Sequence, residues 1–134
     1  MSTDSIFGEV IYSYTRQQAI EDGVLVDLMQ PETEPTVKEA GFKFPVAMTA
    51  AAFEKTVAPI DGDLPAGQSL DARLWDVLYV LMMSIKLCRS TGDTIYFSVN
   101  VWDGKKSNEV KLYSKCGPGD NMEPVITIML VGED

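Results

Sequence analysis

The stretch Ser69-Leu-Asp-Ala-Arg-Leu-Trp-Asp-Val-Leu-Tyr-Val-Leu-Met-Met-Ser-Ile-Lys-Leu-Cys-Arg-Ser90 decides the fold of this chain. Ser69 or Asp71 can cap the start of a helix here, and Gly92 follows the last turn. The apolar residues recur at the 3.6-residue period of a helix and form a stripe that must face a core. The stripe consists of Leu70, Leu74, Val77, Leu78, Leu81, Ile85 and Cys88. The sequence therefore predicts one long central helix from Leu70 to Ser90.

The far side of this helix is also unusually apolar. A surface helix normally carries polar residues there, so these positions need a cover. Either the segment with Phe44 and Phe53 folds over them, or two copies meet in a two-fold dimer. The sequence favours intramolecular cover and a monomer, and leaves open a homodimer through Val80, Met83 and Leu87, which recur after Asp76.

The C-terminal third alternates between apolar and polar residues. Residues 94–102 have the period of a strand with one buried face, Asp103-Gly104 begins a turn, and residues 108–114 alternate again. After a loop rich in glycine and proline, which contains Cys116, residues 125–131 form a third apolar segment. The pattern predicts a C-terminal three-stranded antiparallel sheet on which the central helix packs.

The N-terminal half contains signals for short helices. Thr15 caps a helix that Gly23 ends, a second helix begins near Pro35 and ends at Gly41, and Thr49 caps a third. Residues 6–13 fit an edge strand or an extended segment, and residues 24–28 fit a short strand. The expected fold is a single α+β domain spanning residues 1–134: a long central helix, a three-stranded antiparallel sheet and short N-terminal helices.

Charge and composition restrict the class of partner. The formal net charge is −9, and residues 1–40 contain eight acidic and two basic residues. Such a surface repels nucleic acid and anionic membranes, because phosphate binding needs clustered Lys and Arg. The sequence contains neither a targeting segment nor an apolar run long enough to span a bilayer. We therefore expect a cytoplasmic protein that binds neither nucleic acid nor membranes.

The chain lacks the residues on which common catalytic and metal sites depend. It contains no histidine, and its two cysteines, Cys88 and Cys116, are far apart in the sequence. Neither an imidazole-based triad nor a four-ligand zinc site can be built from these residues, and no phosphate-binding glycine motif occurs. The sequence therefore predicts no catalytic residue, no metal and no cofactor, and favours a role other than catalysis.

Two stretches carry a resemblance to a known family. Ile11-Tyr-Ser-Tyr-Thr-Arg-Gln-Gln-Ala-Ile-Glu-Asp-Gly-Val-Leu-Val-Asp27 and Cys116-Gly-Pro-Gly-Asp-Asn-Met-Glu-Pro-Val-Ile-Thr-Ile-Met-Leu130 resemble an uncharacterised family of small proteins. Bacterial plasmids, phages and other mobile elements carry this family. The resemblance implies a mobile-element accessory protein, with evasion of host defence as one role, and it implies no catalytic residue.

Aromatic, arginine and acidic residues are the candidates for contact with a partner. Tyr and Arg anchor protein contacts more often than most side chains, and a tryptophan at a hairpin tip can do the same. In the alternative interpretation, the tyrosines cover the edge of the core and the arginine pairs with a nearby acid. The candidate partner-binding residues are Tyr12, Tyr14, Arg16, Glu21, Asp22, Asp27, Trp102 and Asp103.

Two functions remain open from the sequence. The favoured one is a non-enzymatic acidic interaction protein of a mobile element, which binds and inhibits a host protein of defence or nucleic-acid handling. The partner would then have a basic surface. The alternative is a small-molecule-binding domain or weak enzyme with a pocket under the central helix, lined by Tyr14, Arg16, Tyr79 and Trp102.

Overall fold

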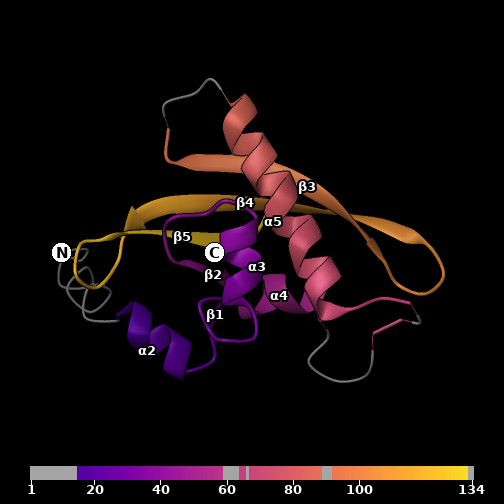
Figure 1. Cartoon of the computed structure of the whole chain (residues 1–134), viewed down its shortest axis with the longest axis horizontal. Helices are drawn as coiled ribbons and strands as arrows, with labels where there is room; N and C mark the ends of the chain where they lie inside the picture. The colour runs from indigo at the N-terminus through magenta and orange to yellow at the C-terminus, as the bar shows by residue number, and fades with distance from the viewer. Residues whose placement is uncertain (1–14, 59–63, 66, 89–91, 133–134) are drawn as a thin grey trace.

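The structure is a computed structural model that describes residues 15–58, 64, 65, 67–88 and 92–132 (Figure 1). Its helices are α2 (Arg16–Glu21), α3 (Glu34–Glu39), α4 (Ala50–Thr56) and α5 (Leu70–Leu87). Its strands are β1 (Leu25–Asp27), β2 (Val46–Thr49), β3 (Thr94–Trp102), β4 (Ser107–Pro118) and β5 (Pro124–Leu130). None of these helices is both long enough and apolar enough to cross a membrane.

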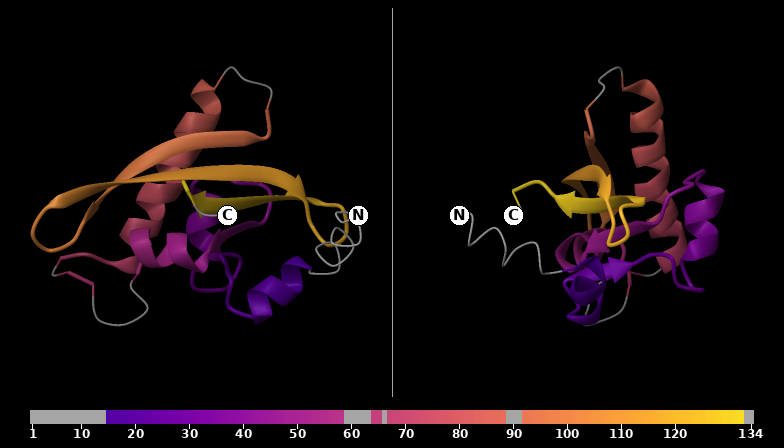
Figure 2. Two further views of the ribbon diagram at one scale, coloured as in Figure 1. Left: turned by 180° about the vertical axis from the view of Figure 1, so that it is seen from behind. Right: turned by 90° about the vertical axis from the view of Figure 1, so that its left-hand side faces the viewer.

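The long central helix is confirmed as α5. The Ser69 hydroxyl caps it by accepting a hydrogen bond from the backbone N–H of Ala72, and the helix ends at Leu87 instead of Ser90. α5 packs on one face of the sheet, mainly over β3 (Figure 2). The predicted stripe provides its fully buried side chains, Leu74, Val77, Leu78 and Leu81.

The predicted three-stranded antiparallel sheet is wrong, because the described residues form a mixed sheet of five strands. The strand order is β1-β2-β5-β4-β3. β3, β4 and β5 form the expected antiparallel meander, but β2 pairs with β5 in parallel and β1 joins β2 antiparallel. The N-terminal half therefore contributes two strands to the sheet in addition to its short helices.

The strand β2 escapes sequence-based prediction for a physical reason. It is four residues long, and Val46, Ala47 and Met48 are all fully buried, so the alternation that marks a strand with one wet face is absent. Val46 and Met48 lie beside Ile126 and Ile128 of β5 on the α5 side of the sheet, while Ala47 points to the other face. Burial on both faces is typical of parallel pairing.

The N-terminal helices form where their caps predict them. Thr15 and Gln18 form a reciprocal capping box at α2, and the Thr49 hydroxyl accepts from the backbone N–H of Ala52 at 3.2 Å in α4. Gly23 and Gly41 follow α2 and α3 with φ of +79° and +102°. The strand expected over residues 6–13 lies outside the described residues.

The expected cover on the far side of α5 is incomplete. Val80 packs partly against the core, but Met83 is 37% exposed and Leu87 is 74% exposed. Phe53 packs against the core, whereas Phe44 is itself exposed. An apolar stripe therefore remains on the outer side of this helix.

Candidate functional site

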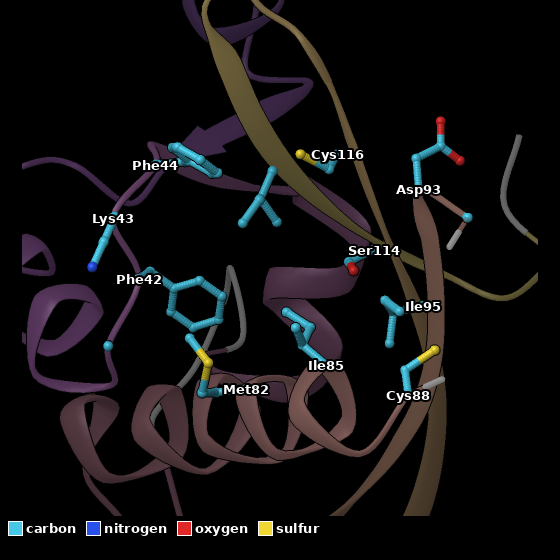
Figure 3. Close-up of a pocket in the computed structure, with 13 residues that line it drawn as sticks. Phe42, Lys43, Phe44, Met82, Ile85, Cys88, Asp93, Ile95, Ser114 and Cys116 are labelled. Atoms are coloured by element: carbon cyan, nitrogen blue, oxygen red, sulfur yellow. The ribbon is translucent and has the colours of Figure 1, made fainter. Parts of the chain in front are cut away.

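A pocket of about 390 Å³ lies between the C-terminal half of α5 and one end of the sheet (Figure 3). Side chains from α5, from the connection between α3 and β2, and from three strands line it. They include Met82 and Ile85 of α5 with its C-cap Cys88, Phe42 and Phe44 of the connection, and Ile95, Ser114, Cys116 and Ile126 of the strands. The lining is predominantly apolar.

Small residues of β4 leave the space for this pocket. On the side of β4 that faces α5, the residues are Val110 and Leu112 over the middle of the helix, then Ser114 and Cys116 towards its C-terminal end. Val110 and Leu112 have branched apolar side chains, whereas Ser114 and Cys116 have only a hydroxymethyl and a thiomethyl group. Because α5 spans both parts as a straight rod, the change from large to small side chains opens a cavity.

Ser114 is the unusual residue of the pocket. It is 3% exposed, and its hydroxyl has no hydrogen-bond partner among the residues that the structure describes. Each of the other buried polar side chains has a partner: the hydroxyls of Thr33 and Thr56 donate to backbone carbonyls at 2.6 and 2.7 Å, and Arg73 Nε donates to the carbonyl of Thr56 at 3.3 Å. Leaving a buried hydroxyl unpaired costs about 1–3 kcal/mol.

The two cysteines come together at this pocket although they are far apart in the sequence. Cys88 follows the last turn of α5, and Cys116 lies on β4 beside Ile126. The expectation that Cys116 lies in a loop is therefore wrong, because β4 continues to Pro118. The charged side chains of the lining, Lys43 and Asp93, are exposed and lie on opposite sides of the pocket (Figure 3).

Arg16 lies on the face of the sheet opposite the pocket. Its Nη1 donates to Thr127 Oγ1 at 2.8 Å and its Nη2 donates to the carbonyl of Ile126 at 3.3 Å. Burial lowers the pKa of the guanidinium, against the opposing effect of the carboxylates of Asp27, Asp120 and Glu123. Arg16 therefore anchors α2 to β5.

The two stretches that carry the family resemblance contact each other. The Asp120 carboxylate accepts from the backbone N–H groups of Arg16 at 2.8 Å and Gln17 at 3.0 Å. Together with the contact between Arg16 and Thr127, this joins the start of α2 to β5 and the loop before it. These contacts indicate that Arg16 and Asp120 have a structural role in holding the two stretches together.

The predicted acidic partner residues of this region also have local roles. Asp27 accepts from the backbone N–H of Met29 and from Gln30 Nε2, both at 2.9 Å. Glu21 accepts from Gln17 Nε2 at 3.1 Å, and Asp22 forms the C-cap of α2. Tyr12 and Tyr14 lie outside the described residues.

Trp102 and Asp103 lie at the opposite end of the sheet from Arg16. Trp102 pairs with Ser107 beside the β3–β4 turn and is 41% exposed. Asp103 accepts from the backbone N–H groups of Lys105 and Lys106 and from Asn108 Nδ2 at 2.8 to 2.9 Å. These hydrogen bonds lower the pKa of Asp103 to about 2. Asp103 shapes the turn.

The structure does not bring together the residues expected around a pocket. Arg16 is on the far face of the sheet, Tyr79 is 50% exposed on the outer side of α5, and Trp102 is at the hairpin. The sequence predicts a pocket near the central helix, but it does not predict the residues that line the observed one. The signal that could have found it is Ser114, a polar residue at an inward position of an alternating strand.

Comparison with known proteins gives one match. Residues 4–134 match the model of a family described as "Family of unknown function (DUF6573)". No curated protein and no solved structure matches the chain. Because the match spans nearly the whole sequence, the chain belongs to this family of unknown function, DUF6573.

Proposed function

We propose that this protein binds a small neutral molecule in the pocket between α5 and the sheet. The observation that carries the proposal is the buried Ser114 hydroxyl, which faces an apolar cavity and has no partner in the described part of the chain. A ligand with an apolar body and one hydrogen-bonding group supplies what is missing. Its polar group pairs with Ser114, and its body fills the space.

The size of the pocket supports this class of ligand. Its volume of about 390 Å³ falls within the range of about 300–1,000 Å³ typical of ligand pockets. A dry cavity of about 150 Å³ is already enough for benzene. Phe42, Met82 and Cys116 offer ring and sulfur contacts that suit an aromatic ligand.

The charges of the lining support a neutral ligand. Lys43 and Asp93 are exposed, so neither places a buried charge beside the cavity. A charged ligand would lose its hydration without gaining a buried counterion from the described lining residues. A serine nucleophile also needs an adjacent base, and the described lining offers none to Ser114. The geometry therefore favours binding over catalysis.

A pair of probes with matched shapes tests the proposal. Phenol and toluene differ in a hydroxyl and a methyl group, so the ratio of their affinities measures the hydrogen bond to Ser114. We expect both probes to shift the NMR methyl signals of Ile85, Ile95 and Ile126. Ser114→Ala should lower the phenol-to-toluene affinity ratio about 2- to 10-fold, the equivalent of one hydrogen bond.

Ser98→Ala is the matched control, because Ser98 lies on β3 and points to the face opposite α5. This variant should leave the affinity ratio unchanged. If neither probe shifts the pocket methyl signals, or if Ser114→Ala and Ser98→Ala have equal effects on the ratio, the pocket is not the binding site proposed here.

Binding of a basic host protein through an acidic surface is a second candidate function, and it stays a prediction. In it, a cytoplasmic mobile-element protein binds a basic host protein through the N-terminal third. It is supported by exposed carboxylates on and near α2 and α3, while Glu34 pairs with Lys38 at 3.5 Å. The test is salt-dependent binding of one purified basic candidate partner, which should weaken when these carboxylates are changed to amides. The exposed carboxylates are Glu21, Asp22, Glu32 and Glu39.

A further inference from the structure

An apolar stripe runs along the outer side of α5, away from the sheet. We call Trp75, Tyr79, Met83 and Leu87 the outer stripe. Tyr79 is 50% exposed, Met83 37% and Leu87 74%. The rings of Trp75 and Tyr79 contact each other with centroids 5.8 Å apart. A monomer's surface helix is normally polar at such positions, so the outer stripe is typical of an interface.

Two opposite charges accompany the outer stripe. Asp76 and Lys86 are both exposed on this side of α5. They are ten residues apart, which corresponds to about 15 Å along a helix, so they cannot pair with each other. Within residues 15–58, 64, 65, 67–88 and 92–132, neither takes part in an ion pair. Their charges are available to a partner.

We propose that a second copy of this chain covers the outer stripe in an antiparallel two-fold dimer. When two α5 helices pack antiparallel about a point midway between Tyr79 and Met83, Tyr79 lies opposite Met83 of the second copy. In the same register, Asp76 lies opposite Lys86 of the second copy. The two-fold axis repeats each contact, giving two ring-to-sulfur contacts and two ion pairs.

The spacing of these residues fits helix pairing. Positions 76, 79, 83 and 86 follow one another at intervals of three, four and three residues, the spacing of the contact seam between two antiparallel helices. Trp75 and Leu87 flank this seam. The same helix carries the acidic residue Asp76 and the basic residue Lys86. A second copy of the chain can therefore pair with both charges.

The dimer and the pocket use different sides of α5. Met82, Ile85 and Cys88 line the pocket, whereas Met83 and Leu87 face outward. The dimer therefore does not depend on ligand binding, and either proposal can fail alone. Because one helix pair buries a small area, we expect weak association, with a Kd on the order of micromolar.

Charge reversal tests the register by sedimentation velocity from about 1 to about 500 µM protein, a range that brackets a micromolar Kd. Asp76→Lys places two lysines opposite each other, and Lys86→Asp places two aspartates opposite each other. We expect each single variant to raise the Kd at least about tenfold. The double variant Asp76→Lys/Lys86→Asp should restore the dimer, and so should an equimolar mixture of the two single variants.

Thermal unfolding of each variant provides the fold control, because both positions are exposed and the monomer should keep its melting temperature. Wild-type protein that stays monomeric at about 500 µM would overturn the proposal, since that is far above a micromolar Kd. A dimer that single reversals leave intact, or that the double variant fails to restore, would overturn the proposed register.

Discussion

The layer between α5 and the sheet differs at its two ends. Towards the start of α5, the helix packs closely: Leu74, Leu78 and Leu81 are fully buried, and the pocket beside Arg73 and Val77 measures only about 20 Å³. Towards its end, Ile85 is only partly buried and faces a pocket of about 390 Å³ together with Ser114. The same helix therefore closes the core at one end and leaves room at the other.

Buried polar groups follow the same division. At the packed end, Arg73 is bonded to the carbonyl of Thr56, and the Thr56 hydroxyl is bonded to the carbonyl of Ala52. At the pocket end, the Ser114 hydroxyl has no partner in the described chain. Space and an unsatisfied donor occur together at this end, and the proposed ligand site rests on this coincidence.

The largest expected difference between the two ends concerns side-chain truncation. Leu81→Ala should lower the free energy of unfolding by about 2–5 kcal/mol, because it opens a new cavity in a packed region. Ile85→Ala only enlarges an existing cavity, so we expect a loss of about 1–2 kcal/mol. Urea denaturation of both variants measures the difference. Equal losses would show that the pocket end is packed as tightly as the other.

A smaller difference is expected for the buried hydroxyls. Thr56→Val removes a hydrogen bond at nearly constant shape and should cost about 1 kcal/mol of unfolding free energy. Ser114→Ala removes an unpaired hydroxyl and should leave that free energy unchanged or raise it by up to about 1 kcal/mol. Both variants can be compared in the same denaturation experiment, without ligand. A Ser114→Ala protein destabilised as much as Thr56→Val would mean that Ser114 already has a partner.

The parts of the fold that follow from local pattern could be predicted. α5 has a 3.6-residue stripe with a cap at Ser69, and β3 alternates without interruption from Thr94 to Trp102. Each signal depends on neighbours within one element. The sequence therefore predicts the helix, the hairpin and the side of the sheet that α5 covers.

The remaining strands depend on contacts distant in sequence. β2 forms because β5, which follows about eighty residues later, offers it a parallel edge, and β1 then pairs with β2. A segment of four buried residues carries no period of its own. The five-stranded sheet therefore could not be recognised from local signals.

The pocket depends on distant contacts in the same way, so the inward position of Ser114 signals a buried polar group but not the cavity around it. Ser114 and Cys116 are small residues in a strand. Their small side chains leave a cavity only because Ile85 of α5 lies across from them. Arg16 is a candidate partner-binding residue in the sequence because arginine often anchors contacts between proteins. In the structure it is bonded to Thr127 within the same chain.

Filling the pocket with protein atoms tests most directly whether this end of the core holds space for a ligand. The measurement is the free energy of unfolding of Ile85→Phe with and without phenol, compared with that of Leu81→Phe. Overpacking a tight core costs about 1–3 kcal/mol, which we expect for Leu81→Phe. Ile85→Phe should stay within about 0.5 kcal/mol of the wild type, because its added atoms enter the pocket, and phenol should no longer stabilise it. An Ile85→Phe protein as destabilised as Leu81→Phe, or one that phenol still stabilises, would contradict the account.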